Sequence, residues 1–479
     1  MIITMKNIKI ALLSALVLVG ASCSDRLELL PEQSLAGSQA FSSAANAEAT
    51  LRGVYSQTQL LEVFGSGPQI IFDYQADNTD FVGSFPTLQD INSYVTTSPN
   101  ATIQSYWQVH YRVINAANSV IENVPGIADP ALTSEISKRL VAEAKFLRAI
   151  THFNLLHMFA QPFQVQSGNT PGVPLLTKSF TGTIEFPARA TVAACYTQIA
   201  KDLNEALVDL PAASTPASRG RASKGAAAGY LSRLHLYKGE FQQAADFANQ
   251  IVSATTSYSL ATNYSFYGAA PTAEHVFVII NSATDNGRTG SGGWASYHRP
   301  ASNGGRGDCA MAPSLETSFG RESTDKRFVD LSTLVTAADG QRKRMTLKFS
   351  DAANNTDLSP LMRTSEIYLN RAEALAELNG INNESLTLVN GIRTRAGLPA
   401  WTATTFTTKA AFISAILEER RKELCFEGHR RMDLLRKGLP LRTTGPTASL
   451  AVFGGPKTIL PLPQREIDLN KNLVQNQSY

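Results

Sequence analysis

Ile416-Leu417-Glu418-Glu419-Arg420-Arg421-Lys422-Glu423-Leu424-Cys425-Phe426-Glu427-Gly428-His429-Arg430-Arg431-Met432-Asp433-Leu434-Leu435-Arg436-Lys437-Gly438 is the stretch that decides the fold of this chain. Its apolar residues recur at helical spacing, which predicts one buried stripe with Ile413, Ile416, Leu417 and Leu424. Its acidic and basic residues can pair three or four positions apart. Gly428 can adopt the left-handed conformation that ends a helix. The stretch predicts two charged helices that meet at Gly428, the second ending at Gly438.

The overall composition is that of an ordinary globular protein. Of 479 residues, 43% are hydrophobic and 17% are charged. The formal net charge is +3, and it falls to +1 when Lys6 and Lys9 are set aside, because 41 basic residues then face 40 acidic ones. A nucleic-acid-binding protein needs a concentrated basic surface. The charge balance therefore predicts no nucleic-acid partner.

The sequence lacks the signatures of catalysis and of metal or cofactor binding. It contains no H-E-x-x-H, G-x-S-x-G or P-loop. The glycine-rich run at 290–295 loosely matches a dinucleotide-binding pattern, but we expect it to open no helix, because Pro300 follows closely. Three cysteines after residue 23, without C-x-x-C spacing, indicate neither a disulfide framework nor a zinc site. We expect no catalytic residue, no metal and no cofactor.

The N-terminus has the pattern of a targeting segment. Lys6 and Lys9 precede a short apolar run at residues 10–19, which is too short to span a bilayer. Gly20-Ala21-Ser22-Cys23 then resembles the cleavage site of a bacterial lipoprotein. We expect residues 1–22 to be a lipoprotein signal peptide, Cys23 to be lipidated, and 23–38 to be a flexible tether. The alternative is an ordinary secretory signal in which Cys23 plays no part.

Helical periodicity dominates the remainder of the chain. We expect helices at 45–61, 107–124, 134–159, 191–210, 224–238, 242–252, 362–378 and 383–395. Two of these helix pairs are interrupted by Gly239 and Gly380 in the manner of tetratricopeptide repeats. Stacked pairs of this kind bury each other's apolar faces. The prediction is a mainly α fold, built on a tetratricopeptide-like helical-repeat scaffold.

Residues 253–361 have a different character. Gly, Ser, Thr and Asn become frequent, and the helical period is lost. Short strands are expected at 275–280 and 345–349. Long loops held on a rigid scaffold often carry binding residues. This loop-rich region with a few short strands is therefore where we expect ligand recognition.

Several motifs recur in order along the chain. They are the Trp107–Asn118 helix, Glu143–Ala149 followed by Phe153, Gly172-Val173-Pro174-Leu175, Glu366–Ala374, Ile392–Pro399 and Leu460–Asp468. Together with residues 416–438, they resemble the SusD/RagB-like outer-membrane nutrient-binding lipoprotein family over nearly all of the chain after Cys23. The resemblance implies a SusD-like N-terminal helical domain at 39–260. It also implies a C-terminal domain at 261–479 that carries binding loops and returning helices.

The resemblance also implies a location and a partner. The protein would be lipid-anchored in the outer membrane and would face the cell exterior, which fits Asp25 and Glu28 close to Cys23 as an export signal. It would capture an oligosaccharide and pass it to a SusC-like TonB-dependent transporter. The family is not enzymatic. Its RagB-like branch binds peptides, which leaves a peptide ligand as an alternative.

A glycan site needs aromatic faces to cover sugar C–H surfaces, and planar polar groups to bind the hydroxyls. Two segments supply both kinds of side chain. The candidate ligand-binding residues are Tyr74 and Asp77 in the first segment, and Trp294, Tyr297 and Arg299 in the second. The competing interpretation is that the aromatic side chains form small hydrophobic clusters beneath loops.

The charged residues of the motifs are expected to be structural. Interlocking ion pairs that fix helix packing are predicted for Arg148, Glu373, Arg393, Arg395, Glu419, Arg420, Arg421 and Asp433. Two further functions stay open. A glycan-degrading enzyme would need two carboxylates that face one cleft, and a purely structural repeat adaptor would bind protein alone.

Overall fold

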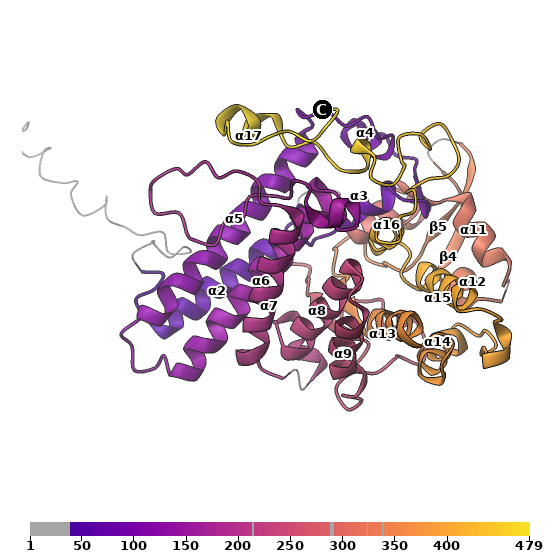
Figure 1. Ribbon diagram of the computed structural model, residues 1–479, viewed down its shortest axis with the longest axis horizontal. Coiled ribbons are helices and arrows are strands. Elements are labelled where there is room, and N and C mark those ends of the chain that lie inside the picture. The colour runs from indigo at the N-terminus through magenta and orange to yellow at the C-terminus, as the bar shows by residue number, and fades with distance from the viewer. Residues whose placement is uncertain (1–38, 213–214, 288–291, 323, 338–339) are drawn as a thin grey trace, which may run out of the picture.

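The computed structural model describes residues 39–212, 215–287, 292–322, 324–337 and 340–479 (Figure 1). The predicted signal peptide, Cys23 and the tether lie outside these residues. Within the described part of the chain, no helix has both the length and the apolar character needed to cross a membrane.

The scaffold is a row of helices, each packed against the next (Figure 1). The row begins with α2 (Ala44–Gln59), α5 (Ala101–Asn123), α6 (Ser134–Phe159), α7 (Val192–Asp209), α8 (Lys224–Lys238) and α9 (Phe241–Val252). It continues with α13 (Thr364–Asn379), which packs on α9 although more than a hundred residues separate them, and then with α14 (Asn383–Arg395) and α15 (Lys409–Glu423). The mainly α, tetratricopeptide-like scaffold is confirmed.

Local sequence explains where these helices begin and end. The side-chain oxygens of Ser43, Thr133, Thr191, Ser223 and Thr408 accept hydrogen bonds from backbone amides in the first turn of their helices. Gly239 has a φ of 83° and ends α8 in the left-handed conformation, as its position predicted. Small buried residues, Ala244, Ala245 and Ala248, let α9 approach its neighbours closely.

The loop-rich region forms two small antiparallel sheets. The strands of the larger sheet lie in the order β1 (Thr79–Phe81), β3 (Cys309–Met311), β5 (Arg342–Thr346) and β4 (Ser332–Thr336). The other sheet pairs β2 (His275–Ile279) with β6 (Ser359–Arg363). The strand predicted at 345–349 therefore lies earlier, at 342–346. Lys348 leaves the sheet because its ammonium group is buried among the polar groups of residues 423–427.

Short helices that the periodicity did not predict connect these parts. They are α3 (Gly67–Tyr74), α4 (Pro86–Asn92), α10 (Trp294–His298), α11 (Pro313–Gly320), α12 (Lys326–Val329) and α17 (Gln464–Leu469). Of these, α10 begins within the glycine-rich run that was expected to open no helix. The second predicted helix of the stretch 416–438 is α16 (Arg430–Leu435). Pro86 and Pro313 stand at the first positions of their helices, where a missing N–H costs nothing.

The stretch 416–438 contains two helices as predicted, but the first ends at Glu423 instead of at Gly428. Lys348 Nζ donates to the carbonyl oxygens of Glu423 (2.9 Å) and Cys425 (2.8 Å), so a buried cation binds carbonyl groups at the end of the helix. Gly428 does adopt the left-handed conformation, with a φ of 79°. Its backbone amide donates to the Asp73 carboxylate across the fold.

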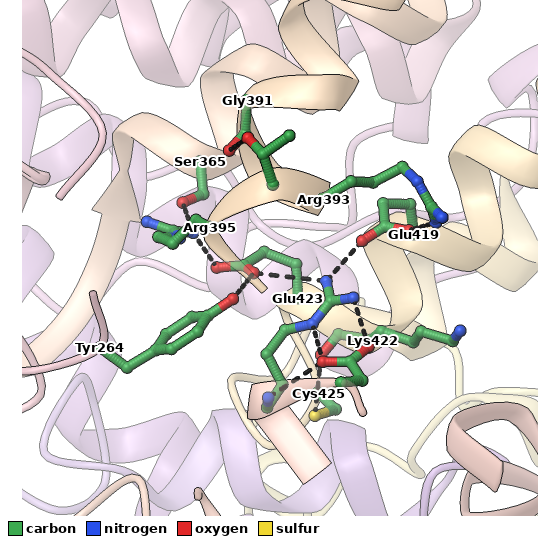
Figure 2. Close-up of polar contacts among 12 residues, drawn as sticks. Tyr264, Ser365, Gly391, Arg393, Arg395, Glu419, Lys422, Glu423 and Cys425 are labelled. Carbon is green, nitrogen blue, oxygen red and sulfur yellow. Dashed lines mark hydrogen bonds and ion pairs between the residues drawn. The ribbon is translucent and has the colours of Figure 1, made fainter. Parts of the chain in front are cut away.

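Glu423 lies at the centre of a buried charge network (Figure 2). Its carboxylate contacts Arg395 at 2.7 Å, Arg363 at 3.1 Å and Arg327 at 3.5 Å. The network balances five cations against five carboxylates, namely Arg327, Lys348, Arg363, Arg393 and Arg395 against Glu274, Asp325, Glu419, Glu423 and Glu427. Buried charges are tolerated when they are paired in this way.

A second buried cluster joins α8, α13, α15 and α16. Arg233, Arg420 and Arg436 bind the carboxylates of Glu366, Glu373 and Asp433. Burial opposes ionisation of Glu366 and Glu373, but the neighbouring guanidinium groups outweigh it and lower the pKa of each carboxyl to about 2. The structural role predicted for the motif charges is confirmed, including Arg148, which pairs with Asp202 between α6 and α7.

Replacing Glu423 with Gln should destabilise the fold by about 3–5 kcal/mol, because three buried arginines lose their shared carboxylate. The free energy of unfolding in urea measures this loss. Glu384→Gln is the control, since Glu384 is 52% exposed in its pair with Arg371 and should cost less than about 1 kcal/mol. Equal effects of the two substitutions would contradict the structural role of the network.

Acid should weaken the fold before the arginine-paired carboxyls of Glu366, Glu373 and Glu423 titrate, because the pKa of each is lowered to about 2. All seven histidines have a lowered pKa because burial disfavours the imidazolium, and it falls to about 4 in His110, His275, His298 and His429. As pH drops below 6.5, the unfolded chain therefore binds protons that the folded chain excludes.

The melting temperature should therefore stay constant at pH values above 6.5 and fall as the pH approaches 4. Calorimetric scans at successive pH values will measure this dependence. His298→Gln should reduce this decline, because it removes one titrating group. A melting temperature that stays constant from pH 6.5 to 4.5 would contradict the prediction.

Candidate ligand-binding site

The structure brings the two predicted ligand-binding segments together. β1 follows the Tyr74–Asp77 segment and pairs with β3, which follows α10 and its loop. Asp80 lies opposite Ala310, and the Val82 amide donates to the Asp308 carbonyl oxygen at 2.9 Å. Sequence reasoning chose both segments but did not predict that they meet.

Tyr74 and Tyr297 lie in the interior at this junction, with exposed fractions of 0% and 7%. The ring of Tyr74 meets Phe81 edge-on at 5.1 Å. Burial raises the pKa of the Tyr74 hydroxyl well above its ordinary value and also raises that of Tyr297, so both phenols stay neutral. The two rings present little surface to a ligand. Ligand contact by Tyr74 and Tyr297 stays a prediction.

Trp294 and Arg299 are occupied by neighbours from distant parts of the chain. The Trp294 indole packs on Phe349 at 4.7 Å and donates to Ser359 Oγ at 2.9 Å. Arg299 Nη1 donates to the carbonyl oxygen of Phe349. A cavity of about 20 Å³ beside Trp294 has room for a single water molecule. A ligand role for Trp294 or Arg299 stays a prediction.

Asp77 is the predicted residue that faces a groove. Its carboxylate binds Arg430 at 2.7 and 2.9 Å and Arg421 at 3.4 Å, and its side chain is 25% exposed. Burial opposes its ionisation, yet the two guanidinium groups prevail and lower the pKa of Asp77 below its ordinary value. Asp77 is therefore a fixed negative group that can accept hydrogen bonds from a ligand.

The groove beside Asp77, which we name the α4 groove, has a volume of about 340 Å³. Its walls present carboxylate, amide, hydroxyl and guanidinium groups. They come from Asp77, Thr79, Asp80, Asn92, Ser93, Ser314, Arg442 and Thr447. Arg442 is anchored by the Tyr74 carbonyl oxygen and by Asn92 Oδ1. Planar polar groups held in this way suit a ligand rich in hydroxyls.

An exposed aromatic side chain lies directly before α4, the helix after which the groove is named. Phe85 precedes α4, whose last residue, Asn92, lines the groove. The Phe85 ring is 48% exposed and lies over the Arg306 guanidinium at 4.1 Å, which lies over Tyr297 at 4.7 Å. Asp308 forms an ion pair with Arg306 and completes this stack. The stack holds the Phe85 ring in place while leaving much of its surface open.

Phe85 and Arg306 were not among the candidate residues. Arg306 belongs to an Arg-Gly-Asp tripeptide whose role depends on a ring more than two hundred residues away. A count of exposed aromatic residues in the first segment could have found Phe85. No group of three His, Cys, Asp or Glu side chains in the described ranges is placed to hold a metal ion.

Comparison with known proteins identifies two matching families and several similar proteins. Residues 339–479 match the family described as the SusD family, and residues 27–236 match the one described as starch-binding and associating with the outer membrane. SusD-like protein P2 of Formosa agariphila is 27% identical, with 98% of this chain and 99% of that protein covered.

Solved structures show the same fold. A putative sugar binding protein from Bacteroides vulgatus is 28% identical over 91% of this chain and 98% of its own, with a TM-score of 0.78. A laminarin binding SusD-like protein is 24% identical over 91% of this chain and 99% of its own, with a TM-score of 0.73. The full-length sequence similarity, the helical row and the two matched segments together place the chain in the SusD/RagB-like family.

Proposed function

We propose that this protein is a cell-surface lipoprotein of the outer membrane that captures an oligosaccharide and passes it to a SusC-like TonB-dependent transporter. The Phe85–Arg306–Tyr297 stack carries the proposal. It presents an exposed ring at one end of α4, and the α4 groove opens at the other end. Aromatic faces and planar polar groups are the two elements that a sugar site needs.

Binding without chemical turnover is favoured by the state of the Asp77 carboxylate. A glycoside hydrolase needs a carboxylic acid that donates a proton, and such an acid has a raised pKa. Asp77 has a lowered pKa and is engaged by Arg421 and Arg430. It is therefore suited to accept hydrogen bonds from a ligand and unsuited to protonate a leaving group.

The similar proteins support a carbohydrate ligand. The Bacteroides vulgatus structure is described as a putative sugar binding protein, and the family matched by residues 27–236 is described as starch-binding. The same family description places its members in association with the outer membrane. A lipid on Cys23, followed by a tether up to residue 38, would hold the described part of the chain at that membrane.

Phe85→Ala should weaken oligosaccharide binding by about tenfold, which corresponds to about 1.4 kcal/mol, because the ring's open face is lost. Titration calorimetry against starch, laminarin and a panel of other glycans measures the effect. Phe186→Ala is the matched control, since Phe186 is equally exposed at 48% but lies away from α4. An affinity unchanged by Phe85→Ala would reject the stack as the site.

Incubation of the protein with the same glycans should release no shorter sugars. Chromatography of the incubated glycans will test this. Product that accumulates with time would favour the glycan-degrading enzyme instead. Binding of peptides with no glycan affinity would favour the peptide alternative.

Cys23→Ser should shift the protein from the membrane fraction to the soluble fraction, because it removes the thiol that would be acylated. Fractionation of the native host, with surface digestion of intact cells by a protease, measures both anchoring and orientation. Ser24→Ala is the control. Membrane association that survives Cys23→Ser would contradict the lipid anchor.

A further inference from the structure

A second groove lies on the outer side of α15, and we name it the Trp401 groove. It has a volume of about 630 Å³ and lies among α11, α15 and the Trp401 segment. Its walls carry the indole of Trp401, the hydroxyl groups of Ser318 and Ser414, and the carboxylates of Glu322 and Glu418. It therefore offers the same two kinds of group as the site beside α4, a large aromatic ring and fixed polar atoms.

Trp401 is held firmly in this groove. Asn390 binds its backbone on both sides, accepting from the Trp401 amide at 2.7 Å and donating to its carbonyl oxygen at 2.8 Å. The Arg393 guanidinium lies 4.2 Å from the ring centre, and its buried side chain is fixed by Glu322 and Glu419. A ring positioned in advance loses little conformational freedom when a ligand binds.

The Trp401 groove and the α4 groove share a wall. Ser314 lines both of them. Arg421 lines the Trp401 groove and donates to Ser314 Oγ at 2.8 Å and to the Asp77 carbonyl oxygen at 3.0 Å. Ser314 Oγ in turn donates to the same carbonyl oxygen at 2.6 Å. The surface therefore passes from Asp77 to Trp401 across polar groups joined by hydrogen bonds.

We propose that the two grooves form one extended path for a single polymeric ligand, with Trp401 binding sugar units beyond those held beside α4. The proposal rests on the proposed function. It specifies the ligand class as a long oligosaccharide or a polysaccharide segment, because a mono- or disaccharide would fill one groove only. Hydroxyl-rich chains suit both grooves, because carboxylates and guanidinium groups line each of them and the α4 groove adds the Asn92 amide.

The test is the dependence of affinity on chain length. Calorimetry with maltose and starch, and with laminaribiose and laminarin, compares a short and a long chain of each linkage. For the linkage that binds, the dissociation constant of the long chain, expressed per chain end, should be at least about tenfold lower than that of the short chain, because the long chain occupies both grooves. Trp401→Ala should remove most of this gain and leave the affinity for the short chain unchanged.

Trp401 also packs on Phe406, so a second variant guards against misfolding. Ser414 is exposed on α15 and lines the groove, and Ser414→Leu would fill the groove without removing any core contact. Ser414→Leu should remove the affinity advantage of the long chain, as Trp401→Ala does. Thr197→Leu, which introduces the same side chain at an exposed position on α7, should leave the gain intact.

The possible failures are distinguishable. Equal affinity for short and long chains, or a gain that survives both groove variants, would overturn the extended path while leaving oligosaccharide capture intact. Absence of binding to every glycan, including those of the wider panel, would overturn the proposed function and the extended path with it.

Discussion

Neutralisation of the buried Glu423 carboxylate by Arg363 and Arg395 is the interaction on which the rest of the structure depends. Glu423 ends α15, Arg395 ends α14, and Arg363 stands between β6 and α13. Arg363 and Arg395 also bind Glu274, directly before β2. One set of charges thus joins the end of the helical row to the region that carries the loops. Hydrophobic packing alone would leave the relative position of these parts less strictly defined.

The two sides of α15 face different surroundings, which are the buried charge clusters on one side and the proposed ligand path on the other. Arg420 and Glu423 point into the buried clusters, whereas Glu418, Arg421 and Lys422 line the Trp401 groove. Arg421 also binds the Asp77 carboxylate. Residues that face a ligand path are therefore fixed by neighbours that belong to the core. A charge-rich motif that identifies a scaffold can supply one wall of a binding surface as well.

Sequence reasoning succeeded where the signal is local and failed where it depends on distant partners. Helices such as α6 and α8 begin after a capping side chain, and α8 ends at a left-handed glycine, so their bounds were predictable from local sequence. Trp294 appeared to have no core to join, but Phe349 and Ser359 reach it from more than fifty residues away. The exposure of Phe85 likewise depends on Arg306 from another loop. Asp77 was chosen as a candidate ligand-binding residue and lines a groove, but its two arginine partners lie near the opposite end of the chain and could not be predicted.

The packing of α13 directly on α9 has a consequence for how such proteins diversify. The chain leaves the helical row after Val252 and rejoins it at Thr364, so the two ends of the intervening segment meet at neighbouring helices. A segment with adjacent ends can change in length or sequence without shifting the helices that flank it. Among its described residues, it supplies Glu274, Asp325, Arg327, Lys348 and Arg363 to the charge network around Glu423. The segment can thus vary while the helical scaffold is kept, so that the same scaffold can present new surfaces.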